Sequence, residues 1–440
     1  MDKKMKLKTF LLVMITGFQI PVLHAQHTFG SLNAVWDYAL SNNPENTIYQ
    51  LKIEQAEQDK KTADSHLYPK ATLNFSGQKN MDIPETPVPG ELLGKPGETV
   101  FLQFGQNYSY SEGLTISKTL FDWQSHYQSK ITKLNVTLRN AEKSYYEQTL
   151  KEQIGQVYYA GLTANEAVKI GDRDLEVADS LLFIAKDRFV QGLIDGLTFN
   201  QAKINRNNVF EKLGQSKQYQ RQCLCNLKLL LGLAPEDTLK LTESILTGFQ
   251  SGGDSLAPDL NEKYTELYRL QTNISDFEAK KTRAKFAPKI DFIRYYGYVQ
   301  YQRDFTMSFQ SSEWRANNYL ALSISIPLFT GFSNKSQYHA AKISRSIAEI
   351  NYQNEIRKSA INDSILVTNC LVSKNLAISA SETYQISLNS IDLAAQKYAQ
   401  GLIGLDEYLR VFDDYLTFEN QYLSRLSDYF INKATIEARK

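Results

Sequence analysis

Few residues in this 440-residue chain have the types and spacing that chemistry requires. The five histidines are scattered along the chain, at His24, His27, His66, His126 and His339. The sequence contains no HExxH, no Walker-type phosphate loop, no CxxC pair and no GxGxxG that opens a helix after a strand. Catalysis and cofactor binding need such groups to converge on one site. We therefore predict a protein that is not an enzyme and that binds no metal or cofactor.

One cluster of charges could act as a group. Glu407, Arg410 and Asp414 are three and four residues apart, so a helix would place them on one face. Asp406 lies beside them, and Asp195 is the comparable acid in the first half of the chain. Carboxylates repeated around a symmetry axis favour cations and can form part of a gate. Alternatively, the acids complement a helix N-terminus while Arg410 pairs with them on the surface, and both interpretations stay open.

The overall charge excludes several classes of partner. Lys plus Arg number 49 and Asp plus Glu number 48, which gives a formal net charge of +1. A chain so balanced has no general attraction for nucleic acid or for an anionic membrane surface. We therefore predict no nucleic-acid partner.

The N-terminus has the pattern of an export signal. Lysines at positions 3, 4, 6 and 8 precede a short apolar run from Phe10 to Ile20, and the following residues offer a cleavage site before Gln26. The run is far shorter than the ~20 apolar residues that a membrane-spanning helix needs. We predict a cleaved signal peptide over residues 1–25 and an exported mature protein.

Two long tracts without proline favour long helices, because proline disrupts helix interiors. Helical patterns are predicted over about 32–66 (with a break at Asn43-Pro44), 123–190, 195–232, 262–285, 333–400 and 405–436. Several carry apolar residues at alternating steps of three and four, the heptad pattern of packed helices. In the last of them, only Glu419 interrupts the apolar seam. A helix over 123–190 would be roughly 100 Å long, which no ordinary globular domain requires.

Two pairs of strands are predicted between these helices, at about 71–79 and 108–121, and at about 290–302 and 317–329. Side chains of a strand point alternately to its two faces. One face of these strands is apolar and carries Leu114, Ile116, Leu120, Leu320, Leu322, Ile324, Ile326 and Leu328. The other face of the last strand is small or polar. This alternation fits a soluble sheet and also fits a membrane barrel whose leucines and isoleucines face lipid.

The second half of the sequence repeats the first. A proline that opens a strand, a Leu-Phe that closes one and a glycine turn between helices occur twice in the same order. Residues 191–194 and 400–403 both read QGLI. We interpret this as a tandem duplication, with repeats over 26–233 and 260–440 and a polar connector over 234–259.

The number of strands limits how a barrel could form. Closed outer-membrane barrels start at about eight strands, so the four strands of one chain cannot close one. Two chains would supply eight strands, and side chains fill the interior of so small a barrel. Three chains would supply twelve strands and leave room for a conduit. If the strands lie in lipid, several chains must share one barrel.

This order of elements resembles the TolC-like outer-membrane efflux protein family (outer membrane factors). The residues that carry the resemblance are Asn43-Pro44, Tyr68–Lys70, Leu120-Phe121, Phe189–Gly192, Ala287–Lys289, Pro327–Gly331 and Tyr398–Gly401. Each motif alone is weak, but the duplicated set in this order is specific and covers essentially the whole mature chain. The resemblance implies an α+β membrane protein. In that fold, a homotrimer shares a twelve-stranded β-barrel in outer-membrane lipid and continues as a periplasmic α-helical barrel.

The resemblance also implies a function and partners. The chain would be the outer-membrane channel of a tripartite efflux or secretion system and would conduct substrates passively. Its partners would be a periplasmic adaptor (a membrane fusion protein) and an inner-membrane pump. In this family the turns between helices form the periplasmic entrance, and an acidic pair early in the last helix lines a constriction. Counted from Gly401, those positions are Glu407 and Arg410, so the second acid is absent and Asp406 or Asp414 would have to replace it.

The repeated turns are the predicted adaptor-docking sites. Their residues are Gly192, Leu193, Ile194, Gly401, Leu402 and Ile403. Glycine alone is explained by the needs of a helix end, whereas the shared Gln and Leu-Ile are not. The rival interpretation of the whole chain is an exported periplasmic coiled-coil scaffold without channel activity.

Overall fold

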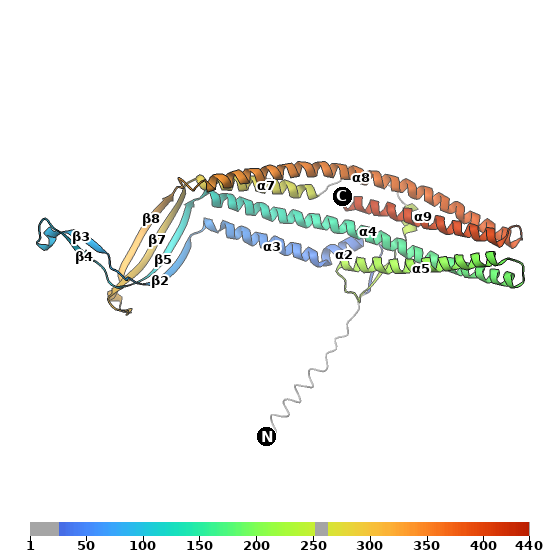
Figure 1. Cartoon of the computed structure of the whole chain (residues 1–440), viewed down its shortest axis with the longest axis horizontal. Coiled ribbons are helices and arrows are strands. Elements are labelled where there is room, and N and C mark those ends of the chain that lie inside the picture. The colour runs from blue at the N-terminus through green and yellow to red at the C-terminus, as the bar shows by residue number, and fades with distance from the viewer. Residues whose placement is uncertain (1–25, 251–262, 440) are drawn as a thin grey trace, which may run out of the picture. The chain divides into compact units, whose positions relative to one another are not determined.

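The computed structural model describes residues 26–250 and 263–439 (Figure 1). The predicted signal peptide and residues 251–259 of the predicted connector lie outside the described residues. The chain forms two compact units, and each draws on both predicted repeats. The first unit is drawn from Met1–Tyr49, Lys143–Lys263 and Arg357–Lys440, and the second from Gln50–Glu142 and Tyr264–Ile356.

The second unit contains a four-stranded antiparallel sheet in the order β2-β5-β7-β8 (Figure 1). Its strands are β2 (Lys70–Lys79), β5 (Tyr108–Phe121), β7 (Lys289–Gln302) and β8 (Arg315–Ser325). The two predicted strand pairs are therefore joined side by side, because β5 of the first pairs with β7 of the second. Within the described chain, β2 and β8 each have one strand neighbour only.

Strand β8 is shorter than the sequence pattern predicts. The strand ends at Ser325, so Ile326 and Leu328 lie beyond it, and their assignment to a strand face is wrong. Proline has no backbone N–H to donate to a ladder, which explains why pairing stops before Pro327. Leu328 is 93% exposed in the single chain.

A second hairpin in this unit was not predicted. Strands β3 (Glu85–Pro89) and β4 (Thr99–Gln103) pair antiparallel and are joined by the short 3-10 helix η2 (Gly90–Leu93). Pro87 and Pro89 give this stretch the composition of a loop. Proline is tolerated in a strand whose N–H side has no partner, as at the edge of a two-stranded sheet.

Helices flank the sheet in the sequence. The second unit contains most of α3 (Pro44–Asp64), the start of α4 (Trp123–Val190), nearly all of α7 (Lys263–Arg283) and the start of α8 (Ser333–Ala399). Short 3-10 helices complete it, at η1 (Ser65–Leu67), η3 (Ala284–Phe286) and η4 (Ser311–Glu313).

The first unit consists mainly of helices. It contains α2 (Leu32–Asn42), α5 (Gly196–Leu231), the short α6 (Ile245–Gln250), α9 (Leu405–Ala438) and the later parts of α4 and α8. One core cluster joins Tyr158 of α4, Leu227 of α5 and Leu426 of α9, all buried. Strands β1 (Gln26–Phe29) and β6 (Thr238–Leu241) pair in parallel beside it. This pairing was not predicted, because strands of four residues carry almost no periodic signal.

The break between α2 and α3 has a clear local cause. The side chain of Asn43 accepts a hydrogen bond from the Glu45 N–H (2.8 Å) and so caps α3, with Pro44 at the first helical position where its missing N–H costs nothing. The same side chain receives the Tyr146 hydroxyl (2.9 Å) and donates to the Leu230 carbonyl (2.8 Å). Asn43 therefore ties this helix start to α4 and α5.

Close approach of α4 and α9 depends on Gly155. A Cβ at this position would lie 2.7 Å from the Ala434 Cβ, so the helices would have to separate. We expect Gly155→Ala to lower the free energy of unfolding by about 1–3 kcal/mol, the usual cost of overpacking. Gly214→Ala in α5 is the matched control, because nothing lies within 4 Å of the added methyl. Gly214→Ala should stabilise the protein slightly, because alanine has a higher helix propensity than glycine. Thermal unfolding followed by circular dichroism measures both, and equal effects would contradict the packing argument.

Candidate functional site

The sheet of the second unit has one apolar face. The register pairs Ile324 with Ile290 and Leu322 with Phe292, and paired side chains lie on the same side of an antiparallel sheet. Of the predicted apolar residues, the register places on this face Leu114, Ile116, Leu320, Leu322 and Ile324, and in the single chain all are exposed or half-buried. Leu120 is also exposed, but it lies at a register shift between Thr119 and Phe121 and has no paired residue in β7. So extensive an exposed apolar surface is normally covered by lipid or by protein.

The opposite face of the sheet is polar. Thr119, Asp291 and Ser323 lie in one row across three strands. The Thr119 hydroxyl donates to Asp291 Oδ1 (2.7 Å), and Lys289 Nζ lies 2.9 Å from the other oxygen of that carboxylate. Such a face suits contact with water.

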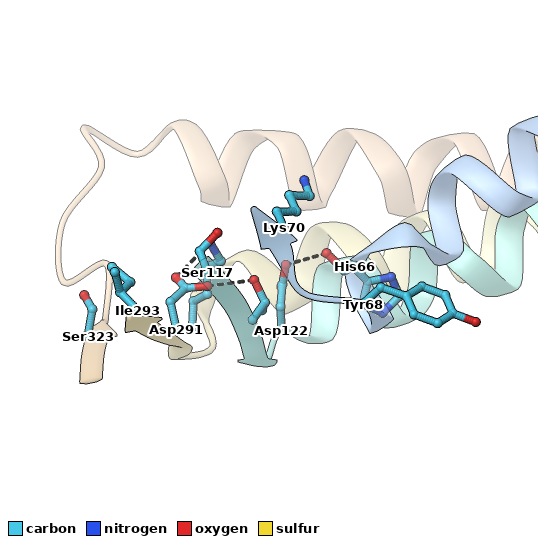
Figure 2. Close-up of a pocket in the computed structure, with 11 residues that line it drawn as sticks. His66, Tyr68, Lys70, Ser117, Asp122, Asp291, Ile293 and Ser323 are labelled. Carbon is cyan, nitrogen blue, oxygen red and sulfur yellow. Dashed lines mark hydrogen bonds and ion pairs between the residues drawn. The ribbon is translucent and has the colours of Figure 1, made fainter. Parts of the chain in front are cut away.

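Polar side chains continue to the end of the sheet where β5 passes into α4, and there they line a cavity of about 430 Å³ (Figure 2). Asp122 belongs to this lining and caps α4. Its carboxylate accepts hydrogen bonds from the Ser125 hydroxyl (2.6 Å) and the Gln124 N–H (2.9 Å). In the described part of the chain, no group of three or more His, Cys, Asp or Glu side chains is placed to hold a metal ion. The cavity is therefore lined mainly by polar side chains.

The two predicted docking turns have the same backbone geometry. Gly192 and Gly401 adopt left-handed φ values of 74° and 73°, which glycine reaches without strain. The Gly192 N–H donates to the Phe189 carbonyl (3.0 Å) and the Leu193 N–H to the Arg188 carbonyl (2.9 Å). The Gly401 turn repeats both bonds at the same distances. Each turn is therefore a Schellman-type helix end.

The side chains of the two turns divide into exposed and packed residues. Leu193 and Leu402 are 67% and 68% exposed. Ile194 and Ile403 pack against the core cluster at this end of the first unit, beside Leu405 and Leu409. The leucines are thus available for contact, whereas the isoleucines hold the turn to its own helices.

The predicted entrance charges are exposed but do not pair. Asp406, Glu407, Arg410 and Asp414 all lie on the surface near the start of α9. Among the described residues, no ion pair links Arg410 to these acids, which removes one part of the surface-pairing interpretation. Asp195 has a structural role, because it caps α5 by accepting the Thr198 N–H (2.8 Å). That hydrogen bond lowers the pKa of Asp195.

A buried pair of acids lies between the helices of the first unit. Glu419 of α9 is 2% exposed and Asp174 of α4 is 8% exposed. The hydroxyls of Tyr384 and Tyr415 both donate to Glu419 Oε1, at 3.0 and 2.7 Å. Sequence reasoning found Glu419 only as a break in an apolar seam. It missed Asp174, because the two acids are far apart in the chain.

The surroundings of Asp174 favour its protonated form. Burial raises the pKa of Asp174 to about 8, and the charge of Glu419 and a hydrogen bond with it act in the same direction. Arg173 and Lys212 oppose that shift. Two carboxylates so close in a poorly solvated site cannot both ionise cheaply. Burial and the charge of Glu419 also raise the pKa of Tyr415, so this tyrosine stays a hydrogen-bond donor.

The raised pKa predicts a pH-dependent stability. Between about pH 4 and about pH 8 the folded chain binds more protons than the unfolded chain, so the free energy of unfolding falls as pH rises through this window. Asp174→Asn should make the free energy of unfolding depend less on pH. At high pH the variant should have a free energy of unfolding higher than that of the natural chain by on the order of a few kcal/mol. Thermal unfolding at about pH 5 and about pH 9 measures this effect. Glu176→Gln, an exposed acid on the same helix, is the control. An unchanged slope in the Asp174 variant would contradict the raised pKa of Asp174.

Comparison with known proteins gives one family match and several matches of fold. No helix among the described residues is both long and apolar enough to cross a membrane. No curated protein matches the chain significantly. Residues 35–233 match the family model described as outer membrane efflux protein.

The fold matches solved outer-membrane channels along nearly the whole chain. CusC, solved in a study of its folding and transmembrane channel formation, is 16% identical with a TM-score of 0.74, and the match covers 95% of this chain and 96% of CusC. The CmeC channel of Campylobacter jejuni is 18% identical with a TM-score of 0.73, covering 93% and 85%. The open-state MtrE channel of Neisseria gonorrhoeae is 17% identical with a TM-score of 0.73, covering 93% and 88%. The chain is thus similar in sequence to the outer membrane efflux protein family over its first repeat, and it has the fold of solved outer-membrane channels along nearly its whole length.

Proposed function

We propose that three copies of the chain form a twelve-stranded barrel in the outer membrane and act as the channel of a tripartite efflux or secretion system. The observation that carries this proposal is the four-stranded sheet with one exposed apolar face and one polar face. In a barrel the apolar face meets lipid and the polar face lines a hydrated lumen.

The free edges of the sheet are a second argument for a barrel shared between chains. Strands β2 and β8 each have an unpaired edge in the described chain, and unpaired edges are not tolerated in hydrocarbon. If β8 of one copy pairs with β2 of the next, three copies close the ring. Each copy then contributes four strands, and the interior is wide enough for a conduit.

The long helices would continue the conduit through the periplasm. Substrates would pass without chemical change. An inner-membrane pump would supply the energy and a periplasmic adaptor would connect the two. The protein would reach the outer membrane after export and removal of the predicted signal peptide.

The scaffold alternative explains the heptad seams but not the sheet. A periplasmic coiled-coil protein would leave Leu320, Leu322 and Ile324 exposed to water at 62%, 61% and 59%. A patch of this kind promotes aggregation. Only a lipid environment makes the same face favourable without a further partner.

The channel proposal is tested by conductance and by a pair of lysine variants. Purified natural protein in planar lipid bilayers should give large, stable conductance steps. Leu114→Lys charges the middle of the apolar face of β5 and should prevent trimer insertion, because a lysine at the bilayer midplane costs about 2–4 kcal/mol. Thr115→Lys, one residue on and on the polar face, should insert and conduct. Absence of conductance from folded natural trimer, or equal behaviour of the two variants, would reject the proposal.

The turns at Gly192 and Gly401 are the proposed adaptor-docking surface, and the charges near them are the proposed entrance. Leu193 and Leu402 present nearly equal exposed apolar surface on the same Schellman geometry. Small exposed apolar residues on a fixed turn suit contact with the end of a helical partner. Asp406, Glu407, Arg410 and Asp414 with Asp195 remain candidates for the gate.

The docking proposal predicts a selective loss of adaptor contact. The double variant Leu193→Asp with Leu402→Asp should reduce crosslinking to the adaptor in the native envelope roughly tenfold or more, because a desolvated contact would receive two charges. Trimers should remain intact. Leu229→Asp is the control, since Leu229 is 77% exposed on α5 but lies far along the helix from both turns. Crosslinking at the natural level in the double variant would exclude the turns as the docking site.

A further inference from the structure

Two basic residues interrupt the apolar face of the sheet. Lys118 of β5 pairs with Phe292, and Ile116 pairs with Arg294 of β7, so Lys118 and Arg294 are diagonal neighbours on the same face. Diagonal positions of this kind have Cα atoms about 7–8 Å apart. The face around the pair is apolar, because Arg294 also lies opposite Leu320 in β8.

These two cations have no partner in the described chain. No hydrogen bond or ion pair joins Lys118 or Arg294 to another described residue, whereas Lys289 on the polar face pairs with Asp291 at 2.9 Å. Glu112 shares the apolar face, but four residues separate it from Ile116, roughly 13 Å along the strand. Unpaired cations on a face that meets lipid need an anion from the surroundings.

A pocket of about 350 Å³ opens beside Lys118. Its walls include Leu67, Leu120, Phe121 and Trp123, so they are mainly apolar and aromatic. The acid of this pocket is Asp122, whose carboxylate is already occupied by the hydrogen bonds that cap α4. The pocket therefore offers an apolar wall next to uncompensated positive charge.

Trp123 adds a hydrogen-bond donor at the rim of this pocket. The indole N–H of Trp36 donates to the Lys151 carbonyl and that of Trp314 to the Ser308 carbonyl, both at 2.9 Å. The N–H of Trp123 has no acceptor among the described residues. Its ring makes edge contacts with Phe121 and His126, both at 5.4 Å between centroids. Tryptophan prefers the interface between hydrocarbon and water, where its ring is apolar and its N–H meets a polar group.

We propose that Lys118 and Arg294 bind the phosphate of an anionic glycerophospholipid, and that an acyl chain of this lipid lies against the walls of the Trp123 pocket. Two cations, a free N–H and an apolar recess together match the headgroup phosphate, the ester region and the chain of such a lipid. The inference rests on the proposed channel function. In that arrangement the end of β5 that enters α4 faces the periplasm, so the lipid belongs to the inner leaflet of the outer membrane.

Lipid titration of the delipidated trimer, followed by native mass spectrometry, tests the site. The probes are phosphatidylglycerol, phosphatidylcholine and inorganic phosphate. Phosphatidylglycerol should bind the natural trimer more tightly than phosphatidylcholine, and inorganic phosphate should not compete. The double variant Lys118→Gln with Arg294→Gln should weaken the tight phosphatidylglycerol binding by about tenfold or more, because each basic side chain at a membrane surface gains roughly fivefold in affinity.

A lysine on the other face of the sheet provides the matched control. Lys70 pairs with Ser117, next to Lys118 in β5, and so lies at the same level but on the polar face. Lys70→Gln should keep the natural lipid affinity. Trp123→Phe keeps the aromatic wall but removes the N–H, and it should weaken binding less than the double variant.

The outcomes separate this inference from the channel proposal. Equal phosphatidylglycerol binding by the natural protein and the double variant would overturn the lipid site, as would equal affinity for phosphatidylcholine or competition by inorganic phosphate. Conductance measured on the same double variant should match that of the natural trimer. If the variant conducts but lipid binding is unaffected, only the lipid site fails. If the natural protein never conducts, the channel proposal fails.

Discussion

Backbone hydrogen bonding at the edges of the sheet is the constraint on which the proposed assembly depends. A peptide group left without a hydrogen bond in hydrocarbon costs several kcal/mol, because no water is present there to supply one. Because β2 and β8 are different strands, each copy brings two unlike edges, and joining unlike edges head to tail produces a ring. The alternation of side chains then decides which face of that ring meets lipid. The need to pair every backbone group thus connects the number of strands per chain with the number of chains in the proposed ring and with the face that meets lipid.

The helices follow a different rule, because their apolar seams must pack on one another. Small residues such as Gly155 let α4 and α9 approach closely, and the apolar seams bury side chains between the helices. The buried acids are the exception to this apolar packing. Two tyrosine hydroxyls donate to Glu419 Oε1, so this oxygen has hydrogen-bond partners inside the bundle. Buried polar networks of this kind can select one helix register over its neighbours.

The sequence predicts some elements well because the signal that defines them is local. β5 and α4 occupy 108–121 and 123–190, because a period of two gives way to a helical period there and no proline lies within the helical tract. The predicted end of β8 is wrong, because the apolar alternation of the sequence continues past Pro327 whereas strand pairing stops before it. The β1–β6 pairing and the Asp174–Glu419 pair were missed for another reason. Both join segments that are distant in the chain, and such contacts appear only in three dimensions.

The near-identity of the two Schellman turns has a consequence for stoichiometry. Gly192 and Gly401 place Leu193 and Leu402 on equivalent backbones with almost equal exposure. Each chain therefore carries two quasi-equivalent tips, and a ring of three chains would display them alternately around its rim. A partner that recognises the tip alone would find twice as many places to bind as there are chains. In such a ring the tips would form an approximately sixfold pattern, because each of the three chains would contribute two of them.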